Sequence, residues 1–436
     1  MRGNNSVVSG RKRRKTPTQA FDLIIVGGGM VGAALACALG GSSLCIGLVD
    51  ANQPPVLALP EHNDFDPRVS ALTMASRNFL ENIGAWSFIS TSRHSPFERM
   101  QVWDADGTGE IVFCAAELGQ IELGYIVENS VTLAGIYQRI AQLQNIEIIA
   151  PRLIANITEL RDGNRSVTLQ DGTVLGASLI VGADGAQSKV RELAAIEVEE
   201  KDYRQRAMVT TVKTELPHQA TAWQRFLPSG PLAFLPLRTS EHDDHYCSIV
   251  WSLDEAQAEP LLALDDAAFA AELAQAFEHR LGAIQSVAPR HVFPLRQRHA
   301  KTYIKAGLAL IGDAAHSIHP LAGQGVNLGL LDAAVLAEEI VRALQRGLPL
   351  TEPSLLSRYQ RRRVANNMLM MQAMTGFKQL FGNRNPALRW LRNSGMSLVN
   401  KLGPVKNHLA AQAMGLSGDL PALARYQPGG TAKIRQ

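Results

Sequence analysis

Short apolar runs joined by glycine turns mark the beginning of the chain. Residues 23–26 (LIIV) and 44–49 (LCIGLV) are two such runs, with a glycine turn at 27–32 and a segment of small residues at 33–39 between them. The second run ends at Asp50. Continuous apolar strands are typical of parallel sheets that are buried on both faces. The pattern therefore predicts a strand, a helix and a second strand that form one βαβ unit.

The rest of the chain predicts a second sheet followed by helices. Residues 179–181 and 308–311 are further apolar runs, each followed by a glycine and aspartate turn. Between about residue 205 and residue 300, strands are expected at 234–237, 247–251 and 292–295, in a mixed or antiparallel sheet. After Gly325 the pattern is helical, with helices over 332–343 and 354–381. This order indicates an α/β fold with a second sheet.

Composition sets limits on the class of protein. The 436 residues are 46% hydrophobic and 19% charged, which is ordinary for a globular chain. The four cysteines are scattered and form no CxxC pair, so we expect no metal site and no disulfide framework, and a reducing compartment. No apolar run reaches about 18 residues, so no membrane-spanning helix is expected.

The net charge of +3 is unevenly distributed. Residues 1–20 carry six Lys/Arg and no acid, and residues 351–436 carry thirteen against Glu352 and Asp419. Nucleic acid is not an expected partner, because no nucleic-acid-binding motif accompanies the charge. A basic helix that holds Arg358 and residues 361–363, followed by a methionine-rich stretch, instead predicts peripheral membrane contact or association with a protein complex through residues 351–420.

The glycine turn has the G-x-G-x-x-G spacing of a dinucleotide site. Gly27 permits the tight turn, Gly29 lets the backbone approach a pyrophosphate, and Gly32 lets the helix pack close to the strand. Asp50, at the end of the second strand, can accept a hydrogen bond from a ribose hydroxyl. The alternative is a glycine turn in a non-binding α/β domain. The motif alone does not choose between FAD and NAD(P).

A second glycine-rich segment follows the apolar run at 308–311. Asp313 stands at the end of that strand, where it can accept a hydrogen bond from a polyol hydroxyl. The N–H groups from Gly323 to Asn327 begin a helix and can stabilise negative charge on a ring. Two such sites in one chain suit an extended ligand that has a diphosphate at one end and a reactive ring at the other.

Three motifs carry a resemblance to the flavoprotein aromatic hydroxylases of the p-hydroxybenzoate hydroxylase type. They are the glycine fingerprint, the DG segment at 183–191 (ADGAQSKVR) and the GD pair at 312–313. Segments 67–72, 124–131 and 313–329 resemble the ubiquinone-biosynthesis branch, over residues 21–420. The resemblance implies a GR2-type, Rossmann-like FAD-binding domain, an interleaved mixed β-sheet substrate domain and a C-terminal helical region.

The same resemblance implies domain bounds and site residues. We expect an FAD-binding domain with insertions (21–200), a β-sheet substrate domain (201–300), the returning part of the FAD-binding domain (301–350) and a basic helical region (351–436). Residues 1–20 lie outside the resemblance, and their basic, polar composition predicts a disordered tail. Residues implied to bind FAD are Gly27, Gly29, Gly32, Asp50, Arg68, Glu128, Asp184, Asp313, Gly325 and Asn327. Pro320, Gly323, Gln324 and Gly325 are implied to border the flavin ring.

The chemistry implied is cofactor-driven, because no Ser-His-Asp order, metal cluster or carboxylate pair stands out in the sequence. NAD(P)H docks transiently and reduces FAD, and a flavin hydroperoxide formed with O₂ hydroxylates a polyprenylated phenol. His316 and His319 are expected to be structural. Phe234, Leu235, Trp251 and Phe293 are for the most part expected to form sheet core rather than a channel for the polyprenyl chain.

Several alternatives stay open at this level. Segments 247–253 and 412–416 most resemble the 2-octaprenylphenol hydroxylases (UbiI, or VisC). Sister enzymes acting on 2-octaprenyl-6-methoxyphenol or 2-octaprenyl-3-methyl-6-methoxy-1,4-benzoquinol are the first alternative. A flavoprotein that only moves hydride and a non-catalytic FAD-binding scaffold subunit are two others. The expected location is cytoplasmic, with peripheral contact at the inner membrane, and a homo-oligomer is left open.

Overall fold

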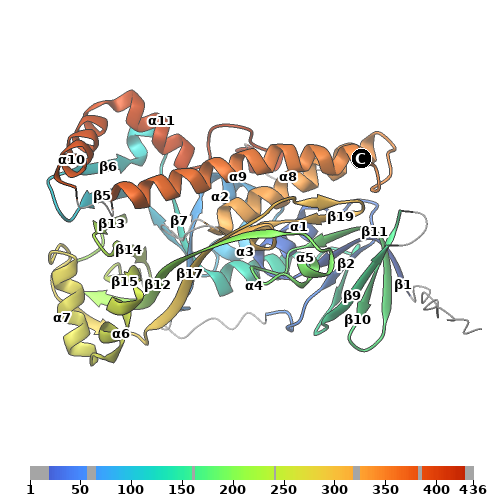
Figure 1. The fold of residues 1–436 in the computed structure, drawn as a ribbon, viewed down its shortest axis with the longest axis horizontal. Coiled ribbons are helices and arrows are strands. Elements are labelled where there is room, and N and C mark those ends of the chain that lie inside the picture. The colour runs from blue at the N-terminus through green and yellow to red at the C-terminus, as the bar shows by residue number, and fades with distance from the viewer. Residues whose placement is uncertain are drawn as a thin grey trace, which may run out of the picture.

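The computed structural model describes residues 19–55, 65–159, 163–239, 242–317, 325–381 and 385–427. Two large sheets lie side by side, and long C-terminal helices run along one side of both (Figure 1). The predicted basic tail at 1–20 falls almost entirely outside the described residues.

The first sheet contains the predicted βαβ unit. Its parallel strands have the order β19-β11-β1-β2-β8, and β18 and the β9–β10 hairpin add antiparallel strands. The strands are β1 (Gln19–Val26), β2 (Ile46–Val49), β8 (Ile146–Ile149), β9 (Ile154–Glu159), β10 (Arg165–Leu169), β11 (Val174–Gly182), β18 (Ile304–Lys305) and β19 (Leu308–Leu310). Helices α1 (Met30–Ala38), α4 (Asn129–Ile140) and α5 (Lys189–Leu193) belong to this part. The side chains of β1 and β2 are almost wholly buried from Leu23 and Ile46 onward, which explains their unbroken apolar runs.

The second sheet has nine strands. Its order is β20-β17-β12-β15-β14-β13-β5-β6, with β16 also on β12, and only the β13–β5 pair is parallel. The strands are β5 (Arg99–Asp104), β6 (Glu110–Cys114), β12 (Val198–Thr214), β13 (Thr221–Leu227), β14 (Gly230–Leu237), β15 (Tyr246–Asp254), β16 (Ile284–Val287), β17 (His291–Ala300) and β20 (His316–Ser317). Helices α6 (Glu255–Ala263) and α7 (Asp266–Ala276) follow β15, and Phe269 and Leu273 of α7 join the same buried cluster as Phe234.

A small third sheet connects the two large ones. It consists of β3 (Val69–Thr73), β4 (Ser95–Phe97) and β7 (Gly124–Glu128) in the order β3-β7-β4. The 3₁₀ turn η1 (Ala115–Leu118) and helices α2 (Met74–Asn82) and α3 (Trp86–Ser90) flank it. Thr73 caps α2, because its hydroxyl accepts a hydrogen bond from the Ser76 N–H.

The C-terminal helices are α8 (Gly325–Gln345), α9 (Pro353–Phe381), α10 (Pro386–Lys401) and α11 (Gly403–Ala413). Helix α9 packs on α8 and continues past the second sheet, and α10 and α11 fold back beside β5 and β6 (Figure 1). The short 3₁₀ turns η2 (Gly312–Ala314) and η4 (Ala422–Ala424) lie near α8. Within the described part of the chain, no helix combines the length and the apolar character needed to cross a bilayer.

Candidate active site

The glycine turn between β1 and α1 leaves room for a ligand at one position only. A Cβ atom on Gly27 would lie 2.3 Å from the Ala183 carbonyl oxygen, and one on Gly32 would lie 2.0 Å from the Gly27 oxygen. A Cβ atom on Gly29 would meet no atom within 4 Å. Gly29 also caps α1 without a side-chain hydrogen bond, so the first N–H groups of the helix remain available. This arrangement fits an anionic group such as a diphosphate.

Asp50 holds the same turn from the end of β2. Its Oδ2 accepts a hydrogen bond from the Gly28 N–H at 2.6 Å, and its Oδ1 accepts one from the Asn52 N–H at 2.7 Å. Beneath the turn, the buried Tyr137 hydroxyl donates to the Gly28 carbonyl at 3.0 Å. Each carboxylate oxygen keeps a lone pair for a ribose hydroxyl. Asp50 therefore shapes the turn and can still serve as an acceptor.

A large cavity of about 600 Å³ lies between the two large sheets. Three predicted cofactor residues, Arg68, Asp313 and Gly325, line it together. The other lining residues come from the third sheet, the DG segment and the second sheet: Pro67, Val69, Asn129, Ala186, Gln187, Ala207, Val209, Val250, residues 293–296, Arg298 and Ser317. The cavity thus gathers residues that are far apart in the sequence.

Asp313 lies on η2 and lines this cavity. The residue is exposed toward the cavity, but the neighbouring protein desolvates its carboxyl enough to raise its pKa, as does nearby Asp332, whereas His316 opposes the shift. When ionised, a carboxyl that faces an open cavity can accept hydrogen bonds from ligand hydroxyls. The predicted polyol contact of Asp313 is consistent with this position.

A buried polar network lies behind Asp313. Asp332 of α8 is fully buried, and its Oδ2 lies 3.0 Å from the Gly312 nitrogen and 2.6 Å from His316 Nε2. Its Oδ1 accepts hydrogen bonds from Arg363 Nε at 2.6 Å and Asn367 Nδ2 at 3.2 Å. Burial opposes ionisation of Asp332, but His316 and Arg363 outweigh it and lower the pKa of the carboxyl.

Several residues whose roles the sequence did not settle have structural roles in or near this network. His316 is only 2% exposed and belongs to the network rather than to the cavity lining, in agreement with the structural interpretation. Arg363 is also 2% exposed, so its expected place on an external basic surface is wrong. Arg358 and Arg362 pair with Glu339 at 2.8 and 3.0 Å, and Arg362 also pairs with Asp419 at 2.7 Å.

Two further predicted residues, Glu128 and Asp184, direct their side chains toward other protein groups. Glu128 is buried and accepts two hydrogen bonds from Arg93, at 2.7 and 2.8 Å. Asp184 accepts from the Ser188 hydroxyl at 2.5 Å and the Val190 N–H at 3.0 Å, at the start of α5. Its neighbours Ala186 and Gln187 are the DG-segment residues that line the cavity.

Asn327 joins the first turn of α8 to β3. Its Nδ2 donates to the Ala71 carbonyl at 2.8 Å, and its Oδ1 accepts from the Thr73 N–H at 3.0 Å. Only its backbone therefore remains for the charge stabilisation expected of this helix start. Pro320, Gly323, Gln324 and His319 lie outside the described residues.

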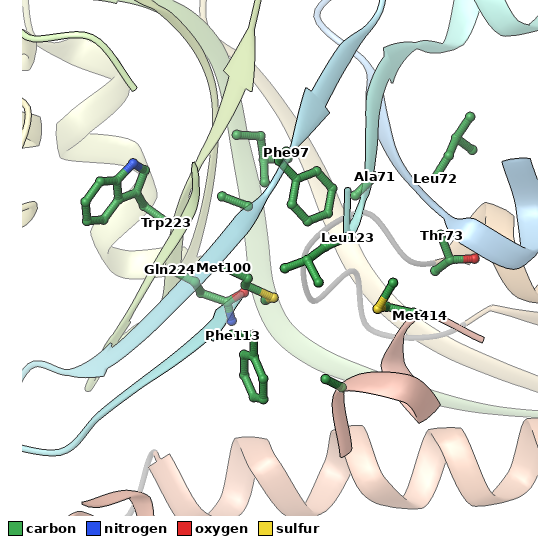
Figure 2. Close-up of a pocket in the computed structure, with 13 residues that line it drawn as sticks. Ala71, Leu72, Thr73, Phe97, Met100, Phe113, Leu123, Trp223, Gln224 and Met414 are labelled. Carbon is green, nitrogen blue, oxygen red and sulfur yellow. The ribbon is translucent and has the colours of Figure 1, made fainter. Parts of the chain in front are cut away.

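A second, strongly apolar cavity lies beside the end of β3 (Figure 2). Val69, at the beginning of β3, lines the large cavity, and Ala71 and Thr73, toward its end, line the apolar one. The remaining lining residues are Leu72, Phe97, Met100, Phe113, Leu123, Ala222, Trp223, Gln224, Leu235, Ala410 and Met414. Figure 2 shows Phe97, Leu123 and Met100 turned toward one another, with Met414 approaching from the C-terminal side.

Most of this lining escaped the sequence analysis, because an apolar residue on a strand has the same pattern whether it faces core or cavity. Phe234 and Trp251 are sheet core, as expected. Leu235 is also core, because it is 2% exposed and belongs to a buried cluster, and it lines the apolar cavity as well. The core expectation is wrong for Phe293, which is 38% exposed and lines the large cavity.

Comparisons with known proteins were made with this geometry in view. A family model described as "FAD binding domain" matches residues 154–374. The chain is 37% identical to the 3-demethoxyubiquinol 3-hydroxylase of Escherichia coli over 91% of this chain and 99% of that protein. It is also 37% identical to the ubiquinone hydroxylase UbiL of Rhodospirillum rubrum, over 93% of each chain.

Solved structures agree on the fold. The p-nitrophenol 4-monooxygenase PnpA of Pseudomonas putida DLL-E4 superposes with a TM-score of 0.74 at 19% identity, covering 92% of this chain and all of that one. At this identity the likeness concerns the fold alone. It confirms the predicted α/β fold with an FAD-binding part, an interleaved second sheet and C-terminal helices.

Proposed function

Because the chain belongs to the FAD-dependent hydroxylases of ubiquinone biosynthesis, we propose that it inserts one oxygen atom of O₂ into the ring of a polyprenylated phenol. The observation that carries this proposal is the pair of cavities that share β3. One has a mixed polar and apolar lining that includes Gly325 at the start of α8, and the other is lined almost wholly by carbon and sulfur atoms. A cofactor ring and a prenylated ring held in these two cavities would approach each other along one strand.

The cofactor has a fitting set of residues. Gly27, Gly29 and Gly32, with the start of α1, would hold the FAD diphosphate, and Asp50 would accept from the adenosine ribose. Arg68 and Asp313 would contact the ribityl chain and the flavin edge, and the start of α8 at Gly325 would face the ring. When bound, FAD supplies the redox chemistry, taking electrons from NAD(P)H and activating O₂.

The chain itself must position the substrate and exclude water. Apolar walls formed by Phe97, Met100 and Leu123 would hold the ring and the beginning of the prenyl chain away from solvent. Thr73 and Gln224 supply polar side chains in the same lining and can orient a phenol hydroxyl. Only one glycine fingerprint occurs in the sequence, so NAD(P)H would dock transiently rather than stay bound.

The ring position hydroxylated has two candidates. The resemblance of segments 247–253 and 412–416 favours 2-octaprenylphenol, and Met414 of the second segment lines the apolar cavity. The name of the E. coli relative, which the chain matches over almost its full length, favours 3-demethoxyubiquinol. Either substrate consists of a polar ring and a long apolar tail, which suits the same two-part site.

Mass spectrometry of quinone-pathway lipids separates the two candidates. A strain that lacks the gene accumulates octaprenylphenol, or its analogue of another prenyl length, if the first candidate is correct. It accumulates a demethoxy-quinone intermediate if the second is correct. An unchanged lipid profile in a strain without a second homologue would contradict both.

Oxygen insertion is also distinguishable from the other flavoprotein activities. An enzyme that only transfers hydride would oxidise NAD(P)H without incorporating oxygen from O₂. A non-catalytic scaffold subunit would bind FAD, but prenylphenol would not stimulate NAD(P)H oxidation. Stimulation of NAD(P)H oxidation by prenylphenol, with ring hydroxylation, supports the proposed monooxygenase. We further propose that the protein works at the inner membrane or in a biosynthetic complex, because its substrate carries a membrane-soluble tail.

A further inference from the structure

Helices α10 and α11 expose a set of large aliphatic side chains. Leu398, Leu402, Val405 and Leu409 are 57%, 44%, 46% and 43% exposed. We call these four residues the apolar face of α10–α11. These four exposed aliphatic residues lie within twelve positions of the sequence. Proteins in water rarely expose apolar residues in such groups, and exposed apolar patches mark interaction sites.

The backbone places these side chains close together. Leu402 directly follows α10 and caps α11: its N–H donates to the Leu398 carbonyl at 3.0 Å, and its carbonyl accepts from the Lys406 N–H at 3.0 Å. Residues four apart are neighbours on a helix surface, which pairs Leu398 with Leu402 and Val405 with Leu409.

The inner side of α11 is part of the substrate-site geometry. Ala410, the residue after exposed Leu409, is 5% exposed and lines the apolar cavity, and so does Met414 just past the helix end. Helix α11 therefore separates the apolar cavity from solvent, and it presents apolar atoms on both sides. This continuity links the outer face to a cavity suited to an aliphatic chain.

Charge distinguishes the possible occupants of this face. From residue 385 to residue 418 the sequence contains no Asp or Glu, but it contains Arg389, Arg392, Lys401 and Lys406. Arg392 forms a buried ion pair with Asp104, Lys406 pairs with the half-exposed Glu117, and Lys401 is exposed beside the apolar face. Two copies of this chain would bring cations together, whereas an anionic bilayer offers complementary headgroups and apolar chains.

We propose that the apolar face of α10–α11 docks on the surface of an anionic bilayer, with Leu402, Val405 and Leu409 entering the headgroup boundary. This placement sets α11 between the bilayer and the apolar cavity, so that a polyprenyl tail passes from lipid to cavity around this helix. The second statement rests on the proposed function, whereas the docking itself does not. The surface differs from the arginine cluster on α9, whose Arg358, Arg362 and Arg363 are engaged in internal ion pairs.

The test is co-sedimentation of the FAD-loaded protein with vesicles of phosphatidylethanolamine and phosphatidylglycerol. The variant Leu402→Ser/Val405→Ser/Leu409→Ser should lose about tenfold or more in vesicle affinity, because three aliphatic side chains no longer leave water on binding. The matched control is Ile148→Ser/Leu153→Ser/Leu216→Ser, which changes three aliphatic residues of similar exposure outside α10–α11. It should bind vesicles as the wild-type protein does.

Several results would overturn the proposal. They are absence of wild-type binding to these vesicles, equal loss in the control, and unchanged binding by the α11 variant. Light scattering that shows a wild-type dimer dissociated by the α11 variant would assign the face to a second copy instead.

A further measurement separates failure of docking from failure of the proposed function. The α11 variant should keep the wild-type FAD spectrum and turnover with a short-chain, water-soluble prenylphenol, and lose turnover only with long-chain substrate in vesicles. If the wild-type protein hydroxylates neither substrate, the proposed function fails while the vesicle result still decides docking.

Discussion

His316 Nε2 lies 2.6 Å from Asp332 Oδ2, and both side chains are buried. The same Asp332 oxygen accepts a hydrogen bond from the Gly312 N–H, and the other oxygen binds Arg363. One carboxylate thus ties the turn that carries Asp313 to helix α8 and to the long helix α9. The position of Asp313 in the large cavity depends on this buried charge.

Neutralising this carboxylate should destabilise the protein strongly. Asp332→Asn keeps the shape but leaves Arg363 buried without its anionic partner, so the free energy of unfolding should fall by about 3–5 kcal/mol in urea titrations. The matched control is Asp266→Asn, which removes an ion pair with Arg290. The Asp266 side chain is 71% exposed. The control should cost less than about 1 kcal/mol. Equal losses in the two variants would contradict the role assigned to the network.

Substitutions at two glycines of the turn should affect cofactor binding and protein stability separately. A side chain on Gly29 points into open space, so Gly29→Val should leave unfolding of the FAD-free protein unchanged while weakening FAD about tenfold or more. Gly32→Ala should destabilise the FAD-free protein itself, because its Cβ atom collides with the Gly27 carbonyl. Thermal unfolding and flavin fluorescence titration measure the two quantities. Wild-type FAD affinity in Gly29→Val would show that the diphosphate binds elsewhere.

Because of His218, the protein should lose stability in mild acid. The ring is fully buried, accepts the Ala220 N–H at Nδ1 and lies 3.1 Å from the Leu237 carbonyl at Nε2, so the neutral form fits the site. Burial lowers its pKa from 6.5 to about 4. Since the unfolded chain binds the proton more tightly, stability is full above pH 6.5 and falls as pH drops toward 4, by about 3 kcal/mol in all.

The check is urea unfolding at a series of pH values between 4 and 7, applied to the wild-type protein and His218→Gln. The variant lacks the titrating ring, so its stability should fall less steeply over this interval. Parallel curves for the two proteins would exclude His218 as the source of the slope.

The apolar cavity predicts a selective effect on substrate binding. Ala71→Leu adds volume to its wall next to Thr73, so the KM for prenylphenol should rise about tenfold. FAD affinity should stay unchanged, because Ala71 does not line the large cavity. Steady-state kinetics and flavin titration on one preparation test both points. Loss of FAD with unchanged KM would reverse the assignment of the two cavities.

Local patterns predicted the FAD half of the fold well. The glycine turn, α1 and the strand ending at Asp50 follow each other within about thirty residues, and each leaves its own signature of apolar runs and small residues. The hairpin β5–β6 had no such signature, because it joins the second sheet only through its long-range parallel pairing with β13. No periodicity in a single segment reports that contact.

The candidate site was predictable only where a motif supplied it. Arg68, Asp313 and Gly325, which the resemblance named as cofactor residues, line one cavity. Arg93, which binds Glu128 from 35 residues away, and Asp332, which anchors Gly312, are ordinary charged residues in the sequence. Their importance comes from burial, which a charge pattern does not record. The same reason explains why Arg363 was assigned to the surface.

The most direct test of the proposed function is hydroxylation of prenylphenol by the FAD-loaded enzyme under ¹⁸O₂, with NADH or NADPH as the reductant. Mass spectrometry of the product should find one ¹⁸O atom on the ring. NAD(P)H oxidation without ¹⁸O in the ring, or a ring oxygen that comes from water, would contradict the assignment of this protein as a monooxygenase.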